Sequence, residues 1–294
     1  MNLSGIIPPL LTPFKENGEV DFDRIPILVD FMKPFVQGFF VCGTYGSGIL
    51  MDVAERKKVF ETVAEYLDGS YQLVAHVGAA SHRDALDLVE HAVQHHALAV
   101  TAVPPFYFHY DEETLFLYYR DLIKASSVPV YLYDNPGASG NPISPELIDR
   151  LAGIGLNGVK DSTFDIGKTY SVIRKVQKRD FDVVIGSESL LLPAFALGVR
   201  ACVSGLANVL PELMNRLYEA ALGTDQVLAK DLQMKVLKMW DILHYGPSIP
   251  TALAMLQVRG LQAGFPRKPM LPLGGEVYTR VADAMRETRP TWDI

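Results

Sequence analysis

Short apolar runs recur along the chain, and each is followed by a segment with helical periodicity. The runs are nearly continuous in Val, Ile and Leu, which is typical of strands buried on both faces of a parallel sheet. Their starts are spaced about 20–35 residues apart, the length of a strand–loop–helix–loop unit. The eight runs are Gly5–Thr12, Gly38–Gly43, Gln72–Gly78, Leu98–Pro105, Pro129–Pro136, Gly155–Ser162, Asp182–Ser187 and Ala201–Asn208.

Helix signals fill the segments between these runs. Four helical patterns follow a residue that can accept hydrogen bonds from the first N–H groups of a helix: Asp52, Ser81, Asp111 and Ser144. Residues 23–36 are also helical in pattern but contain Pro26 and Pro34, so we expect a break near residue 33. After Asn208 the strand pattern stops, and three helical patterns follow at 211–222, 225–244 and 248–263.

Alternating strands and helices predict an α/β fold with a parallel sheet, and eight repeats predict a closed (β/α)8 TIM barrel. An open, doubly wound sheet is the alternative that this pattern leaves. We expect residues 1–222 to form the barrel that carries the active site. Residues 223–294 are expected to form a C-terminal helical extension that packs on the barrel.

Composition narrows the class of protein. The 294 residues include 27 basic and 34 acidic side chains, for a net charge of −7, and no basic run that would bind nucleic-acid phosphates. Cys42 and Cys202 do not make a disulfide framework and fit a reducing compartment. We recognise no signal peptide and no segment apolar enough to span a membrane. The expected protein is therefore cytoplasmic, with no nucleic-acid or membrane partner.

Functional side chains of a parallel barrel gather at the carboxyl ends of its strands. The segments at these ends are Gly43-Thr44-Tyr45-Gly46, Tyr107, Tyr133-Asp134-Asn135, Lys160-Asp161, Gly186-Ser187-Glu188 and Ser204-Gly205. Lys160 ends an apolar strand, where burial would lower its pKa and make the amine a nucleophile that forms a Schiff base with a carbonyl. The alternative is a surface lysine paired with Asp161.

Two further features lie at neighbouring strand ends. Tyr133 ends the strand before Lys160, so its phenol is a candidate proton shuttle, although in a chain with 13 tyrosines it is also a candidate packed aromatic. The loop at residues 43–48 offers backbone N–H groups and hydroxyls that would hold a carboxylate or phosphate. A flexible turn is the alternative for this loop.

Other chemistries have weaker signals. His91 and His95 share one face of a helix, but no third ligand is evident, so we predict no metal site. His76 is interpreted as a hydrogen-bonded core histidine rather than a base. The charge run at residues 55–58 is interpreted as a solvated helix face.

Taken together, the strand ends resemble the pyruvate-dependent class I aldolases related to dihydrodipicolinate synthase and N-acetylneuraminate lyase. The resemblance covers the chain from Gly5 to Pro272 and is closest to the sialic acid lyase and 2-keto-3-deoxygluconate aldolase branches. Five segments match family motifs in order and spacing: Gly43-Thr44-Tyr45-Gly46, Phe106-Tyr107, Tyr133-Asp134-Asn135-Pro136, Gly158-Val159-Lys160-Asp161-Ser162 and Pro266-Arg267-Lys268-Pro269.

The resemblance implies a barrel enzyme without metal or external cofactor, usually a homotetramer built as a dimer of dimers. It implies that pyruvate condenses with Lys160 and that the amides of Thr44 and Tyr45 hold its carboxylate. It also implies that Tyr133 moves a proton to or from the aldehyde oxygen, through Thr44 and, across a subunit contact, Tyr107. The substrate-binding set implied in this way is Gly43, Thr44, Tyr45, Gly186, Glu188, Ser189 and Ser204.

The chain departs from the family motifs at four positions. Tyr45 replaces a threonine, Ser47 a frequent glutamate and Asp134 an asparagine. Ala138 stands where dihydrodipicolinate synthases place an arginine that grips the aspartate semialdehyde carboxylate, and alanine cannot make that pair. Sialic acid lyases and 2-keto-3-deoxygluconate aldolases carry small or apolar residues there.

The sequence therefore predicts a Schiff-base lyase that cleaves a 2-keto-3-deoxy sugar acid to pyruvate and an aldehyde, or catalyses the reverse condensation. The alternative enzyme is a 4-hydroxy-tetrahydrodipicolinate (dihydrodipicolinate) synthase, which condenses pyruvate with aspartate semialdehyde. A non-catalytic member that binds a keto acid is a third possibility.

Overall fold

Eight parallel strands form one sheet in the computed structural model, which describes residues 2–292. The strands are β1 (Gly5–Ile7), β2 (Gly38–Val41), β3 (Gln72–His76), β4 (Ala99–Ala102), β5 (Val130–Asp134), β6 (Gly158–Asp161), β7 (Asp182–Ile185) and β8 (Ala201–Val203). Their order is β1-β8-β7-β6-β5-β4-β3-β2, so strands adjacent in the sequence are neighbours in the sheet. An open doubly wound sheet would reverse its order at a switch point, so that alternative is wrong.

The segment after β1 closes the sheet into a barrel. The Phe40 N–H of β2 donates to Pro8 O at 3.0 Å, and the Leu10 N–H donates to Phe40 O at 2.9 Å. These bonds join the two ends of the strand order, so the predicted (β/α)8 barrel is confirmed.

Asn208 also stabilises this closing junction of the barrel, the seam, through the segment that follows β1. Its Oδ1 accepts from the Leu11 N–H at 3.0 Å, and its Nδ2 donates to Pro9 O at 3.1 Å. One buried amide thus satisfies two backbone groups of a segment that lies 197–199 residues earlier in the chain.

All eight predicted strands exist, but each is shorter than predicted. The first ends at Ile7 rather than Thr12, and the last ends at Val203 rather than Asn208. The residues beyond each strand turn into loops or short helices over the mouth of the barrel, such as the 3₁₀ turns η3 (Gly48–Leu50), η4 (Glu188–Leu190) and η5 (Leu206–Asn208). Apolar runs alone do not mark this point, because the loop residues are buried as well.

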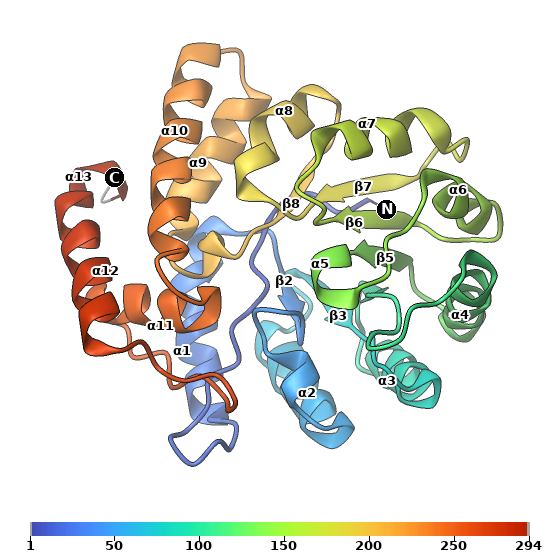
Figure 1. Cartoon of the computed structure of the whole chain (residues 1–294), viewed down its shortest axis with the longest axis horizontal. Helices are drawn as coiled ribbons and strands as arrows, with labels where there is room; N and C mark the ends of the chain where they lie inside the picture. The colour runs from blue at the N-terminus through green and yellow to red at the C-terminus, as the bar shows by residue number, and fades with distance from the viewer. Residues whose placement is uncertain (1, 293–294) are drawn as a thin grey trace.

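Helices surround the strands in Figure 1. They are α1 (Ile25–Met32), α2 (Val53–Leu67), α3 (His82–Gln94), α4 (Glu112–Ala125), α5 (Pro136–Ser139), α6 (Pro145–Gly153), α7 (Ile166–Lys175), α8 (Leu191–Ala196) and α9 (Pro211–Leu222). The side chains of all four predicted capping residues, Asp52, Ser81, Asp111 and Ser144, accept a backbone N–H of the following helix, which confirms these starts. The predicted break near residue 33 is also confirmed, since α1 gives way to the 3₁₀ turn η2 (Lys33–Phe35).

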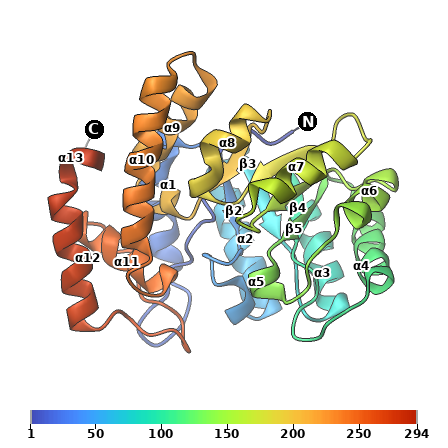
Figure 2. The same ribbon diagram turned by 45° about the horizontal axis from the view of Figure 1, so that its top comes forward.

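The tail is helical, as predicted, and begins after α9 ends at Leu222. Its helices are α10 (Gln226–Leu243), α11 (Ser248–Val258), α12 (Gly275–Glu287) and α13 (Arg289–Trp292). The segment predicted to extend to residue 263 ends at Val258, and α12 and α13 were not predicted. Helix α10 packs against α9 and η4, and α12 packs against α10 and α11, so the tail covers one side of the barrel (Figure 2). None of the helices in residues 2–292 combines the length and apolarity that crossing a bilayer requires.

Two apolar cores stabilise this arrangement. The larger core fills the space between strands and helices, and the smaller one lies inside the barrel. Members of the inner core include Ile7, Phe40, Val74, Tyr131, Tyr133 and Val184. The inner core surrounds the side chain of Lys160, which lies above the ring of Phe40.

Candidate active site

The register of β5 and β6 decides which side chains face the inside of the barrel. Tyr133 pairs with Lys160, and Lys160 pairs with Val184 of β7, so these three side chains point to the same face. Tyr133 and Val184 belong to the inner core, which places Lys160 inside the barrel. Asp134 and Asp161 are the next pair in this register and point outward to the helices.

Lys160 is surrounded by aromatic rings rather than by carboxylates. Its Nζ lies 3.4 Å from the ring centroid of Tyr133 and 4.7 Å from that of Phe40. The residue is 5% exposed, and within residues 2–292 no carboxylate lies within ion-pair distance of its Nζ. Burial lowers the pKa of Lys160 below its ordinary value, although Tyr133 opposes this shift. Burial therefore favours the neutral, nucleophilic form of this amine over the charged form.

Asp161 does not pair with Lys160, so the alternative of a surface ion pair is wrong. The carboxylate of Asp161 faces outward, where Oδ1 accepts from the N–H and hydroxyl of Thr163 at 3.0 and 2.7 Å. Its Oδ2 accepts from the Thr169 hydroxyl at 2.7 Å. Asp161 thus ties β6 to the start of α7 instead of neutralising the lysine.

The hydroxyl of Tyr133 has two polar partners. It lies 3.3 Å from Thr44 Oγ1 and accepts from Asn135 Nδ2 at 3.2 Å. Burial raises the pKa of Tyr133, but the positive charge of Lys160 and these hydrogen bonds outweigh burial, so the net pKa lies below its ordinary value. The ring also packs against Phe40 and His76 at 5.9 and 5.8 Å between centroids. Tyr133 is thus both a packed aromatic and a group prepared to exchange a proton.

Close packing shapes the loop at residues 43–48. A Cβ on Gly48 would lie 1.8 Å from Cys42 O, and one on Gly43 would lie 2.4 Å from the ring of Phe40. Ser47 is buried in the left-handed region at φ 53°. This packing favours one loop shape over a flexible turn. Within the described chain the N–H groups of Thr44 and Tyr45 donate no hydrogen bond, so both remain free for a ligand.

Tyr45 extends from this loop to the end of β8. A Cβ on Gly205 would lie 2.3 Å from its ring, so the glycine makes room for the tyrosine. Burial raises the pKa of Tyr45 above its ordinary value, and the nearby Glu188 carboxylate raises it further. The replacement of threonine by Tyr45 is thus accommodated by a glycine on another strand end.

The segment after β7 forms a buried polar wall. Glu188 Oε1 accepts from the Ser204 hydroxyl at 2.9 Å and from the Leu206 N–H at 2.8 Å. Ser187 and Ser189 join their hydroxyls at 2.8 Å. A Cβ on Gly186 would lie 1.9 Å from Ser162 Oγ, so this glycine permits the close approach of β6 and β7. The Ser204 hydroxyl and one oxygen of Glu188 are therefore already engaged in hydrogen bonds within the protein.

Tyr107 lies apart from these groups. Its side chain is 87% exposed, its backbone has φ 84°, and its ring packs edge-on against Phe108 at 5.0 Å. Within residues 2–292, Tyr107 forms no hydrogen bond with Tyr133 or Thr44. The role predicted for Tyr107 across a subunit contact stays a prediction.

Two departures from the motifs have a structural account. Asp134 points outward and forms an ion pair of 2.5 Å with Lys168 of α7, so it does not contact the interior. Ala138 is exposed in α5 above the strand ends. Asn135 was placed at a strand end by the sequence but was given no role there, and its hydrogen bond to Tyr133 now makes it a candidate site residue.

Buried groups beneath the loop support it. His76 Nδ1 bonds to Cys42 O at 3.2 Å and its Nε2 accepts from the Val103 N–H at 3.4 Å, which confirms a core histidine. Burial holds the pKa of His76 well below its ordinary value, so the ring is neutral. The interpretation of residues 55–58 as a solvated face is wrong for Arg56, which is 4% exposed and donates to His76 O at 2.6 Å and Gly78 O at 3.1 Å.

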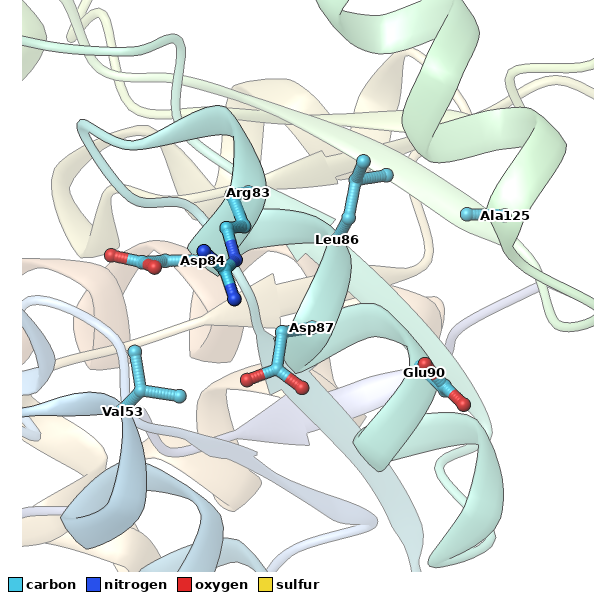
Figure 3. A pocket seen from close by; sticks show the side chains of 7 residues that line it. All are labelled: Val53, Arg83, Asp84, Leu86, Asp87, Glu90 and Ala125. Carbon is cyan, nitrogen blue, oxygen red and sulfur yellow. The ribbon is translucent and has the colours of Figure 1, made fainter.

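A hollow of about 800 Å³ lies outside the barrel, between α2, α3 and α4 (Figure 3). Its lining is Val53, Arg83, Asp84, Leu86, Asp87, Glu90 and Ala125. None of the predicted site residues lines it, and its three carboxylates lie on one helix. Volume alone therefore does not locate the reactive groups of this molecule, which are inside the barrel mouth.

Comparison with known proteins assigns the chain to a family. Residues 2–288 match the dihydrodipicolinate synthetase family. The chain belongs to this family. Its relatives include a 4-hydroxy-tetrahydrodipicolinate synthase of Archaeoglobus fulgidus, 29% identical, with 96% of this chain and 97% of the relative covered. An N-acetylneuraminate lyase of Rhizobium meliloti is 30% identical, with 92% and 90% covered.

Solved structures extend the comparison to three dimensions. A dihydrodipicolinate synthase of Bacillus anthracis has a TM-score of 0.93 at 28% identity, covering 97% of this chain and 99% of that one. A 2-keto-3-deoxygluconate aldolase of Sulfolobus solfataricus has a TM-score of 0.90 at 23% identity, covering 97% and 96%, and shows the shared fold. The family makes or breaks carbon–carbon bonds, and this member is a pyruvate-dependent aldolase or lyase acting on a small molecule.

Proposed function

We propose that the enzyme cleaves a 2-keto-3-deoxy sugar acid to pyruvate and an aldehyde through a Schiff base on Lys160. The observation that carries this proposal is the buried amine of Lys160, which has no carboxylate partner and lies against the ring of Tyr133. A lysine with a lowered pKa is a nucleophile for a ketone, and an adjacent phenol is suited to move the proton that carbon–carbon cleavage requires.

The reaction begins when the free amine of Lys160 attacks the C2 ketone and water leaves, which forms an imine. Protonation of the imine nitrogen makes it an electron sink. Tyr133 supplies that proton and is left as a phenolate, which then takes the proton of the C4 hydroxyl while the C3–C4 bond breaks and its electron pair passes into the iminium to give an enamine. Protonation at C3 and hydrolysis release pyruvate and restore the lysine.

The loop at residues 43–48 is the proposed site for the substrate carboxylate. The free amides of Thr44 and Tyr45 provide two donors on a loop of fixed shape. The hydroxyl of Thr44 lies next to that of Tyr133 and is the first group to which a proton would pass from Tyr133. We place Tyr107 of a neighbouring subunit at the outer end of this path, in a homotetramer built as a dimer of dimers.

The choice of a sugar acid rests on Ala138 and on the wall after β7. Ala138 provides no positive charge for an anionic aldehyde. Glu188 and the hydroxyl pair of Ser187 and Ser189 offer acceptors and donors for sugar hydroxyls. The second candidate is a 4-hydroxy-tetrahydrodipicolinate synthase, which the name of the Archaeoglobus relative favours and Ala138 disfavours. A non-catalytic keto-acid sensor would have no need of the reactive pair.

The substrate class is tested by steady-state kinetics. In the condensation direction, neutral polyhydroxy aldehydes should give a higher kcat/KM with pyruvate than aspartate semialdehyde does. One charged hydrogen bond contributes about 1.5–3 kcal/mol, so the missing contact corresponds to roughly 10- to 150-fold. A preference for the semialdehyde would replace the lyase with the synthase, and no turnover of either class would favour the sensor.

The role of Lys160 is tested by trapping. Incubation with pyruvate and borohydride should inactivate the enzyme, and peptide mapping should find the reduced adduct on Lys160. Lys160→Arg should neither trap pyruvate nor turn over substrate, because the guanidinium stays protonated. Lys168→Arg is the matched control, since Lys168 is also largely buried but faces outward, and this variant should trap normally. An adduct on another lysine would remove Lys160 from the mechanism.

A further inference from the structure

Three potential metal ligands meet on the outside of the barrel, away from Lys160. His91 and His95 lie one turn apart at the end of α3, and Glu61 lies on the neighbouring helix α2. One nitrogen of each histidine and a carboxylate oxygen of Glu61 all lie within 4.8 Å of one another. The sequence showed no third ligand for the histidine pair because Glu61 is 30 residues away and reaches it only through helix packing.

The distances suit a tetrahedral ion. The Oε1 atom of Glu61 lies 3.0 Å from His91 Nε2 and 3.7 Å from His95 Nε2. An ion with bonds of about 2.0–2.1 Å holds tetrahedral ligand atoms about 3.3–3.4 Å apart, a value between the two distances. Small side-chain rotations would therefore bring Glu61 Oε1 to this distance from both histidine nitrogens, which lie within 4.8 Å of each other.

Each ligand is already oriented for this role. The side chain of His91 is 10% exposed, and its ring packs edge-on against Phe60 at 6.4 Å, which fixes its direction. The Oε2 atom of Glu61 accepts from Lys58 Nζ at 3.1 Å, and its Oε1 atom faces the histidines. His95, with its side chain 35% exposed, leaves the site open to solvent.

The end of α3 adds a favourable field. His95 is the C-cap of this helix, where unsatisfied carbonyl groups carry a partial negative charge that favours cations. Two histidines four residues apart on one helix face also match the spacing that zinc-binding helices use. A single hydrogen bond between His91 and Glu61 would not require the second imidazole, whose ring stacks on the first at 4.3 Å.

We propose that Glu61, His91 and His95 bind one zinc ion, with water completing its coordination. Zinc prefers nitrogen and oxygen ligands in this number and geometry, and three protein ligands with a water is a common arrangement. Such an ion would link α2 to α3 on the outer wall of the barrel. Because the ion binds only the folded chain, it should raise the melting temperature.

The test uses the full chain freed of metal by a chelator and then titrated with zinc chloride. Calorimetry should show one zinc per chain, and cobalt(II) should give the visible absorption of a tetrahedral nitrogen–oxygen site. His95→Asn and Glu61→Gln should each weaken zinc binding by at least about 100-fold, since loss of a ligand should exceed the effect of losing a supporting contact. The same two variants should lose the zinc-dependent rise in melting temperature.

His96→Asn is the matched control, because it makes the same substitution one residue further along. His96 is exposed and has φ 61°, a conformation that asparagine tolerates. This variant should bind zinc as the unaltered chain does. The proposal is overturned if the unaltered chain binds no stoichiometric zinc, if His95→Asn and Glu61→Gln bind it undiminished, or if His96→Asn weakens binding equally. Circular dichroism confirms that each variant is folded.

Discussion

Strands β5 and β6 present an inward and an outward row of side chains, and the two rows differ in the partners of their ionisable groups. The inward pair, Tyr133 and Lys160, holds a lysine whose amine faces aromatic rings. The outward pair, Asp134 and Asp161, holds carboxylates that reach Lys168 and the hydroxyl of Thr169. Positions one residue apart thus give an amine without a carboxylate partner and carboxylates with polar or ionic partners. Where such partners are missing, burial favours the neutral and reactive form of the group, and where they are present, the charged group becomes structural.

Among substitutions that keep Lys160, the largest expected effect comes from removing the inward hydroxyl. Tyr133→Phe keeps the ring but deletes the proton shuttle, so kcat should fall by about 10²–10⁴-fold while pyruvate trapping remains detectable. Tyr131→Phe is the control on the same strand and face, since its hydroxyl donates to Asp182 at 2.8 Å and lies two residues away from Lys160's partner. It should leave kcat nearly unchanged. Equal kcat losses in both variants would show that removing any hydroxyl from the inner row lowers kcat, so that the loss would not identify Tyr133 as the proton shuttle.

The outward ion pair should affect stability rather than chemistry. Lys168→Met leaves the Asp134 carboxyl buried without its partner and should lower the free energy of unfolding by about 3 kcal/mol. The double variant Lys168→Met with Asp134→Leu should recover most of this loss. Urea unfolding measures both values, and borohydride trapping checks that the site is intact. A large loss of kcat with unchanged stability would contradict the division between the two rows.

The pH dependence should report the inward pair. Because burial lowers the pKa of Lys160, kcat/KM should rise about tenfold per pH unit and level off below the ordinary lysine value of about 10.4. Tyr133 opposes the effect of burial, so Tyr133→Phe should move the midpoint to lower pH. The two groups interact, and the midpoints therefore belong to the pair. A profile with its midpoint at or above the ordinary lysine value would mean that burial does not govern the amine.

The smallest expected effect concerns Asn135. Asn135→Val removes the donor to the Tyr133 hydroxyl, and one hydrogen bond contributes about 0.5–1.5 kcal/mol, so kcat should fall roughly 2- to 10-fold. Because that hydrogen bond lowers the pKa of Tyr133, the same substitution should raise it. Stopped-flow measurement of the proton-transfer step would detect both changes. An unaltered kcat would show that Asn135 does not contribute to proton transfer.

Much of this division follows from the sequence. The apolar run that ends in Lys160 predicted a strand end, and side chains alternate along a strand, so an inward Tyr133 also implies an outward Asp134. The same kind of pattern was present for Arg56, which shares a helix face with Val59, Phe60 and Val63 but was hidden by its charged neighbours. Glu61 is different, because no local pattern indicates which helix packs beside the histidines. Contacts between helices are set by tertiary packing, and sequence periodicity does not specify them.

The seam at Asn208 has a consequence for how the protein is made. The first strand pairs with the last, and Leu11 and Asn208, which share a hydrogen bond, are 197 residues apart. During synthesis, the ribosome must therefore make about seven tenths of the polypeptide before the barrel can close. Until then β1 lacks its partner β8 and presents an unpaired backbone edge with apolar side chains, which is prone to association with other nascent chains. The step that completes the seam is thus also the step that ends this exposure.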